Sequence, residues 1–218
     1  MKKLVVVVIL LAWFAAPARA DFDAGVAAFA RGDYASALKE FRPLAEKGNI
    51  SAQNNLGLMY ERGYGVAQDD AEAVHWYRRA AEQGNVGAQS NLGHMYNEGK
   101  GVTQDHAEAA RWFRRAADQE HPLAQYNLGV LHTFGNGVPK DYSEAFRWYQ
   151  RAAEQGFADA QNNLGVMYLR GDGVPKDYIR AHMWLSLAAS RGFKDSPMWI
   201  SRIERKMNSS QIAKAQKL

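Results

Sequence analysis

Few residues of this chain have the types and spacing of a catalytic centre. The sequence has six histidines and no cysteine, which excludes thiol nucleophiles and cysteine-ligated zinc. The histidines show no ligand spacing on one helix face, and no Gly-x-Ser-x-Gly, His-Glu-x-x-His or Walker motif occurs. His132 replaces a tyrosine found in related segments, which indicates a packed histidine; a ligand or catalytic role is the alternative. The sequence therefore predicts no enzyme, no metal site and no cofactor.

Paired arginines are the residues that could bind a polyanion. Arg78-Arg79 and Arg114-Arg115 recur at the same spacing, with Arg151 in the next segment. An acidic residue follows three or four positions later each time, within ion-pair reach along a helix. These acidic residues are Glu82, Asp118 and Glu154. We expect a solvated and mutually neutralised helix face rather than a nucleic-acid site.

A Gly-x-Gly-Val motif could be mistaken for a phosphate-binding loop. Such a loop needs a preceding strand and a longer glycine pattern, whereas a helical pattern precedes each motif here. The glycines instead predict tight turns between antiparallel helices. The motif begins at Gly63, Gly99, Gly135 and Gly171.

The glycine motif recurs with a period of 36 residues, and other residues share this period. Tryptophan occurs at Trp76, Trp112, Trp148 and Trp184, and Leu-Gly pairs begin at Leu56, Leu92, Leu128 and Leu164. Self-similarity at such a period predicts a stacked repeat array, in which each unit buries its apolar face against its neighbours. The tryptophan column is therefore predicted to be structural.

Each unit contains the pattern of two helices. The segment from Ser51 to Gly63 places Ala52, Leu56, Met59 and Tyr60 on one face. The segment from Asp69 to Gly84 begins with an N-cap aspartate in a capping-box-like pattern. Its apolar face comprises Ala73, Trp76, Tyr77, Ala80 and Ala81.

The repeated pattern A-x-x-x-L-G-x-x-Y-x-x-G-x-G-V, followed by D-x-x-x-A-x-x-W-Y-x-x-A-A-x-x-G, resembles the Sel-one-like repeat family over residues 51–193. These are α/α repeats related to tetratricopeptide repeats. The resemblance implies an all-α, right-handed α/α superhelical solenoid. It also implies a protein-binding scaffold whose first helices line a concave groove.

Four positions of each first helix are expected to face this groove, and their residues vary between units. They are Asn54, Ser90, Tyr126 and Asn162; Leu58, His94, Val130 and Val166; Glu61, Asn97, Thr133 and Leu169; and Arg62, Glu98, Phe134 and Arg170. Beside them an asparagine is fixed at Asn55, Asn91, Asn127 and Asn163. It could hold a bound peptide backbone, or it could join neighbouring helices by hydrogen bonds.

The predicted protein-binding site is centred on the third unit. Tyr126, Asn127, Val130 and Phe134 are expected to project toward one surface, and exposed aromatic residues among amides make good contact sites. The alternative is that Phe134 packs on the turn at Gly135. The whole predicted site comprises Asn91, His94, Asn97, Tyr126, Asn127, Val130, Phe134, Asn162 and Asn163.

The first 20 residues have the features of a secretory signal peptide. Lys2 and Lys3 precede an apolar run, and Ala18-Arg19-Ala20 is a small-residue cleavage signal; an uncleaved membrane anchor is the alternative. Cleavage after Ala20 would leave 24 basic and 23 acidic residues, so no basic field argues for nucleic acid. We expect a periplasmic or secreted protein.

The remaining segments are expected to cap the array. The predicted boundaries are 1–20 for the signal, 21–50 for an N-terminal cap, 51–86, 87–122, 123–158 and 159–193 for four repeats, and 194–218 for C-terminal capping helices. The tail could instead be a partner-binding helix. A helix start is expected at Ser196-Pro197, and a break at Asn208-Ser209.

These features favour an exported interaction scaffold, monomeric or weakly oligomeric, that binds a protein or peptide of unknown identity. A purely structural part of an envelope assembly is a second possibility. The alternative is a cell-wall-related small-molecule binder or hydrolase of the β-lactamase type. Cysteine-rich members of the family linked to that activity carry cysteine pairs within repeats, whereas this chain has no cysteine.

Overall fold

The computed structural model describes residues 20–217, and the predicted signal segment lies outside this range apart from Ala20. Within it the chain forms twelve helices and no strand. The helices are α1 (Phe22–Ala30), α2 (Tyr34–Glu46), α3 (Ile50–Arg62), α4 (Asp70–Glu82), α5 (Val86–Glu98), α6 (His106–Ala117), α7 (Pro122–Phe134), α8 (Tyr142–Glu154), α9 (Ala158–Arg170), α10 (Tyr178–Ser190), α11 (Ser196–Glu204) and α12 (Ser209–Ala215). The predicted all-α class is confirmed.

Side-chain caps fix where the paired helices begin. The second helix of each pair begins after an aspartate, as at Asp69, whose carboxylate accepts the backbone N–H groups of Ala71 and Glu72. First helices α3 and α5 begin after Asn49 and Asn85. These caps satisfy backbone donors that have no partner inside the helix, so they set the register of each unit.

The glycine motifs form the turns inside each pair. Gly135 ends α7 with φ +78°, and Gly137 follows with φ +69°, a backbone conformation that other residues adopt only with strain. The prediction of helix–helix turns is therefore confirmed. A Cβ on Gly137 would collide with the backbone of His106 and Ala107, so the turn lies directly against the start of α6 in the preceding repeat.

The Leu-Gly glycine lets the two helices of a pair approach closely. A Cβ built on Gly129 would lie 2.6 Å from the Tyr149 ring of α8, and one on Gly57 would lie 2.6 Å from Tyr77 of α4. The missing side chain on the first helix thus makes room for a buried ring on the second. Tyr77 and Tyr149 are at most 2% exposed.

The tryptophan column joins successive pairs. Trp76, Trp112 and Trp148 are 4–8% exposed, and each belongs to a core cluster formed by the preceding unit and the first helix of its own unit. Trp184 in the last repeat is only half-buried. Burial of the first three agrees with a structural role, because buried aromatic rings contribute much of a core's apolar area.

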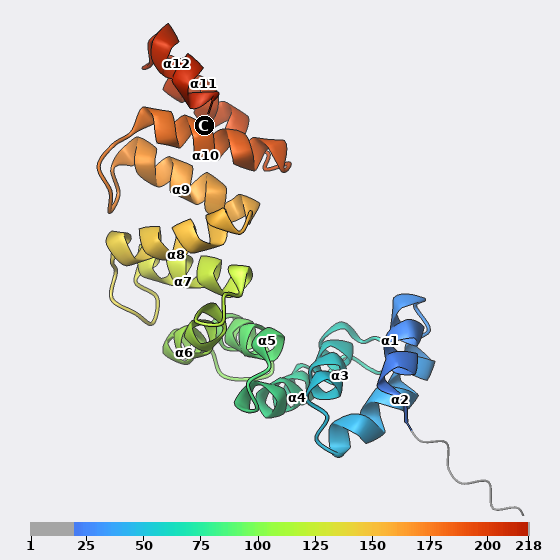
Figure 1. Cartoon of the computed structure of the whole chain (residues 1–218). Helices are drawn as coiled ribbons and strands as arrows, with labels where there is room; N and C mark the ends of the chain where they lie inside the picture. The colour runs from blue at the N-terminus through green and yellow to red at the C-terminus, as the bar shows by residue number, and fades with distance from the viewer. Residues whose placement is uncertain (1–19, 218) are drawn as a thin grey trace, which may run out of the picture.

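The helix pairs stack into a bent array, with α1–α2 at one end and α11–α12 at the other (Figure 1). Figure 1 shows α3 and α5 on the inside of the bend and α4 and α6 on its outside. We call the surface lined by the first helices the inner surface. At the C-terminal end α11 and α12 pack on α10, with Ile203 fully buried. No helix among residues 20–217 is long and apolar enough to cross a membrane.

Candidate functional site

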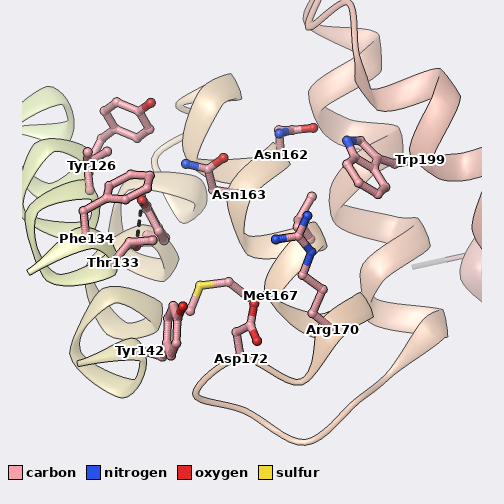
Figure 2. Close-up of a pocket in the computed structure, with 13 residues that line it drawn as sticks. Tyr126, Thr133, Phe134, Tyr142, Asn162, Asn163, Met167, Arg170, Asp172 and Trp199 are labelled. Atoms are coloured by element: carbon pink, nitrogen blue, oxygen red, sulfur yellow. Dashed lines mark hydrogen bonds between the residues drawn. The ribbon is translucent and has the colours of Figure 1, made fainter. Parts of the chain in front are cut away.

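A pocket of about 410 Å³ lies on the inner surface between α7, α9 and α11. Figure 2 shows Tyr126 and Phe134 on one side, Asn162 and Asn163 between, and Trp199 on the other. We call this the α7–α9 pocket. It brings together five of the nine predicted site residues, namely Tyr126, Val130, Phe134, Asn162 and Asn163. Thr133, Tyr142, Tyr149, Val166, Met167, Arg170, Asp172 and Trp199 complete it.

Phe134 is the most exposed large apolar residue described in the chain. Its side chain is 67% exposed at the edge of the pocket, and it therefore does not pack tightly on the turn at Gly135. The other three repeats carry Arg62, Glu98 and Arg170 at this position. Stacking of the repeats therefore does not require an apolar side chain here, so Phe134 is a candidate contact residue.

Tyr126 has a structural role beside its place in the pocket. Its ring centroid lies 5.8 Å from that of Tyr149 and 5.2 Å from that of Phe157. Burial raises the pKa of the Tyr126 phenol, and the nearby Asp159 raises it further. The neutral phenol can donate a hydrogen bond, but removal of the ring would also disturb the packing of α7 on α8 and α9.

A hydrogen-bond relay holds the floor of the pocket. Thr133 Oγ1 donates to the Gly129 carbonyl at 2.7 Å and lies 3.2 Å from the Tyr149 hydroxyl. Because the single threonine proton is used, the Tyr149 hydroxyl is the donor in the second contact. Burial raises the pKa of Tyr149 to about 12, so this donor is retained at neutral pH.

The C-terminal cap supplies the far wall of the pocket. The Ser196 hydroxyl donates to the Asn162 side-chain oxygen at 3.1 Å, and both residues are buried. This bond ties α11 to α9. Trp199 of α11 has the guanidinium groups of Arg170 and Arg202 each 5.6 Å from its ring centroid. The tail therefore belongs to the site as well as sealing the end of the array.

Three further predicted residues lie in a separate inner pocket. Asn91, His94 and Asn127 line a hollow of about 320 Å³ on α3, α5 and α7. The Asn91 amide donates to the Asn54 side chain at 3.3 Å, which joins neighbouring first helices. Asn97 lines neither pocket, because its amide contacts Glu98 and His106. Eight of the nine predicted residues are thus divided between two pockets.

The groove-facing position that carries Glu61, Asn97, Thr133 and Leu169 in the four repeats does not vary freely, contrary to expectation. Glu61 accepts a 2.7 Å hydrogen bond from the buried Tyr77 hydroxyl, and Thr133 accepts one from Tyr149. In the second repeat the ring is Phe113, which needs no acceptor, and Asn97 turns away to His106. This position therefore follows the identity of a ring inside the same repeat rather than that of a partner.

A fixed glutamine is the polar residue that sequence reasoning missed. Gln53, Gln89, Gln125 and Gln161 are at most 4% exposed, and each donates to the C-terminal carbonyl of the preceding second helix, as Gln125 does to Ala117 at 3.2 Å. A second glutamine then donates to three of them, as Gln155 does to Gln125 at 2.8 Å. The signal was available, because this glutamine follows the alanine that repeats every 36 residues.

The arginine face differs from the predicted pattern of local ion pairs. Among residues 20–217 only Arg114 forms its expected pair, with Asp118 at 3.2 Å, while Glu154 accepts from Gln150. Arg79, Arg115 and Arg151 instead lie 4.5–5.0 Å from the tryptophan of their own helix. Guanidinium groups over the column are attracted by the ring face and shield it from water.

The described residues contain no group of three histidine, aspartate or glutamate side chains placed to hold a metal ion. Serine, histidine and glutamate meet once, where His182 lies 3.3 Å from Ser186 Oγ and 3.0 Å from Glu204. The imidazole is buried, and none of these residues lines a pocket described here. The contact between His182 and Glu204 joins α10 to α11. His132 contacts the Pro139 carbonyl at 3.3 Å.

Comparison with known proteins agrees with this architecture. The family model of the Sel1 repeat matches residues 50–85, 86–121, 122–157 and 158–193. A protective antigen present in uropathogenic Escherichia coli strains, which displays an SLR fold, is 40% identical with a TM-score of 0.80, over 84% of this chain and 40% of that chain. A Sel1 repeat protein from Oxalobacter formigenes is 35% identical with a TM-score of 0.78, over 84% of this chain and 75% of that one. A search of curated protein sequences found no match.

The chain spans about 40% of the length of the E. coli antigen, so the resemblance concerns the repeat array and not that whole protein. The four matched repeats account for well over half of the present sequence. The predicted solenoid is confirmed by both the helix pairs and these neighbours. The chain belongs to the Sel1 repeat family.

Proposed function

We propose that this Sel1 repeat array is an exported scaffold that binds a protein or peptide at the α7–α9 pocket. The observation that carries the proposal is Phe134, an apolar side chain left 67% exposed where the other repeats have charged residues. Sel1 repeat arrays generally mediate protein interactions, which supports a macromolecular partner over a substrate.

The other walls of the pocket suit a peptide segment. Val130, Val166 and Met167 offer an apolar floor, and Asn163 offers an amide for a peptide backbone. A pocket of about 410 Å³ accommodates one or two side chains rather than a folded surface. An apolar anchor residue beside backbone hydrogen bonds is a common mode of peptide recognition.

The charge of this half of the array favours an acidic partner. Residues 122–217 contain 13 basic and 8 acidic side chains, whereas residues 21–121 contain 11 basic and 15 acidic. Complementary charge mainly accelerates encounter and is screened by salt. We expect the association rate to fall as salt rises, while the dissociation rate depends chiefly on Phe134.

The test begins with capture of the partner inside the native cell. A photo-crosslinking residue placed at position 134 should capture it, and the same residue at position 98, the equivalent place in the second repeat, is the matched control. Binding of the captured partner is then measured with Phe134→Ala, which should cost ~1–3 kcal/mol if the ring is a hot spot. A variant that binds as tightly as the parent protein would place the site elsewhere.

Export is tested independently of binding. The basic start, apolar run and Ala18-Arg19-Ala20 support cleavage after Ala20. Mass analysis of the protein from its native cell should then find Asp21 at the N-terminus, in the periplasmic or secreted fraction. Recovery from the cytoplasm with Met1 retained would contradict export without affecting the proposed binding site.

A further inference from the structure

A larger pocket lies between α6, α7 and the turn that follows α7. Its volume is about 580 Å³, and none of its residues lines either inner pocket. One wall carries Arg111, Arg114 and Arg115 of α6, with His132 of α7 facing them, and Leu128 and Val138 are among its apolar residues. We call it the α6–α7 pocket. Neither the family match nor the proposed binding at the inner surface accounts for it.

His132 is the residue that distinguishes this junction from the others. At the equivalent position α3 carries Tyr60 and α5 carries Tyr96. An arginine from the preceding second helix donates to each phenol oxygen, with a distance of 3.1 Å for Arg42 and 2.6 Å for Arg78. Each of these hydrogen bonds joins a second helix to the first helix of the next repeat and so closes the junction between them.

At the junction between α6 of the second repeat and α7 of the third, this arginine–tyrosine hydrogen bond is missing. Arg114 occupies the place of Arg78, but His132 has no phenol oxygen to accept its hydrogen bond. Arg114 instead pairs with Asp118 and lies 4.8 Å from the Trp148 ring. The imidazole Nδ1 lies 3.3 Å from the Pro139 carbonyl, which can only accept, so the proton is on Nδ1. The space that a tyrosine would fill stays open.

The same junction carries the most cationic second helix. At the three places where α6 has Arg111, Arg114 and Arg115, α4 has one histidine and two arginines, and α8 has two arginines and a glutamine. Glu108 pairs with Arg111 at 2.9 Å, and Asp118 with Arg114 at 3.2 Å. Arg115 forms no ion pair within residues 20–217.

The two ion pairs do not block an incoming anion. The Arg111 side chain is 77% exposed, and the Arg114 and Asp118 side chains are 54% and 56% exposed. Exposed pairs of this kind contribute little stability, so their guanidinium groups can turn to another oxyanion at small cost. Arginine is suited to this, because its planar N–H groups match the geometry of phosphate and carboxylate.

We propose that the α6–α7 pocket binds a small organic anion, a phosphate or carboxylate carried on an apolar group. The arginines of α6 hold the oxyanion, and Leu128, Val138 and Pro139 contact the apolar part. The volume exceeds what a bare phosphate needs and lies within the range of small-molecule sites. The replacement of the repeated tyrosine by His132 and the third arginine of α6 occur together at one junction only, and this coincidence carries the assignment.

The probe is phenyl phosphate, measured by isothermal titration calorimetry with the mature chain at neutral pH. Inorganic phosphate and phenol, tested separately, report the contributions of the anion and the ring. The decisive variant is His132→Tyr, which restores the phenol that Arg78 and Arg42 contact elsewhere. It should weaken phenyl phosphate binding by about tenfold or more, because the pocket is filled and Arg114 is engaged.

A matched pair of variants protects the test against changes in folding. Arg115→Gln should weaken binding by a similar factor, whereas Arg79→Gln, the equivalent change one repeat earlier, should leave it unchanged. Circular dichroism melting of each variant verifies that the array is intact, and Arg115→Gln carries the test if His132→Tyr does not fold.

Several results would overturn the proposal. Phenyl phosphate that does not bind at millimolar concentration excludes this class of ligand. If phenol binds as tightly as phenyl phosphate, the pocket does not recognise the anion. If inorganic phosphate binds as tightly as phenyl phosphate, the pocket does not recognise the apolar part. Unchanged binding in both His132→Tyr and Arg115→Gln places the ligand at another surface.

Discussion

Phe134 and His132 are two residues apart on α7 and belong to different pockets. Each replaces a residue type that the other repeats use at the same place. The fixed residues, by contrast, fill the core or satisfy buried polar groups, as Gln125 does. At the scale of single residues, departures from the repeat are therefore the places where function is to be sought.

His121 should make the start of α7 sensitive to pH. Its Nδ1 accepts the Ala124 backbone N–H at 3.3 Å, where the equivalent α3 and α5 caps are Asn49 and Asn85. Burial lowers the pKa of His121, so the unfolded chain binds the proton more readily than the folded one. Stability is then fully present above the ordinary histidine pKa of about 6.5 and falls as the pH drops below it.

The matched variant is His121→Asn, which keeps a capping oxygen and removes the titration. The melting temperature of the parent protein should fall further than that of this variant when the pH is lowered from about 7.5 to about 5.5, across the ordinary histidine pKa. The measurement is thermal denaturation followed by circular dichroism in matched ionic strength. Equal losses in the two proteins would show that other groups cause the pH dependence.

Trp148 tests the structural role of the tryptophan column. It is 4% exposed, and the guanidinium carbons of Arg114 and Arg151 each lie 4.8 Å from its ring centroid. Trp148→Ala should lower the free energy of unfolding by ~3–5 kcal/mol in urea denaturation, as for other buried aromatic residues. Trp148→Phe should cost less, because the indole N–H has no hydrogen-bond partner within the described chain. An unchanged midpoint for the alanine variant would contradict the role.

At the scale of elements, the approach of paired helices depends on one missing side chain. Gly129 faces the Tyr149 ring, and the equivalent glycines face Tyr77, Phe113 and, in the fourth repeat, Leu185. Gly87, in the first turn of α5, has its nearest neighbour at 3.4 Å from a built Cβ. Gly87 and Gly129 both lie in the first helix of a pair, but only Gly87 has space for a side chain.

Alanine substitution should therefore have opposite effects at these two places. Gly129→Ala forces α7 and α8 apart and should destabilise the array by ~1–3 kcal/mol. Gly87→Ala meets no clash and should stabilise it by ~0.4–1 kcal/mol, because the unfolded chain loses freedom. Urea denaturation of both variants decides the matter, and a Gly129→Ala variant as stable as Gly87→Ala would refute close packing at this point.

The elements were more predictable from sequence than the contacts between them. Aspartate and asparagine caps and the glycine turns depend on neighbouring residues, so helices such as α4 and their order could be predicted. The role of Gln53 depends on a carbonyl of α2 and on the Gln83 amide directly after α4, which come together only after stacking. Likewise, Asn97 and Thr133 differ because of the ring each meets on the next helix, which the pattern of one helix cannot reveal.

At the scale of the whole molecule, the array is held by contacts between successive helices. Beyond these, the substantial contacts are those of α12 with α10 and of α11 with α9 at the C-terminal end. Stability should then be a sum of repeat and interface contributions, without a central core that one change could destroy. The repeats share one period, so an added unit meets the same surfaces on both sides.

Duplication of residues 122–157 should therefore give a longer, folded array. The inserted copy keeps the glutamine contacts and the turn at Gly137 in register, and helix content by circular dichroism and the urea midpoint should both rise. Duplication of residues 122–156 is the control, because the loss of one residue shifts the contacts at the joint between the two copies. If the two insertions behave alike, register between repeats does not govern stability.

The dependence on successive contacts also makes the array compliant. The inner pocket on α3, α5 and α7 and the α7–α9 pocket share helix α7. A small rotation at each junction adds to those before it, so the ends of the array can move by far more than any single interface. The array should therefore be flexible along its length. A ligand bound at one junction, such as that between α6 and α7, would change the length of the inner surface that is available to a partner.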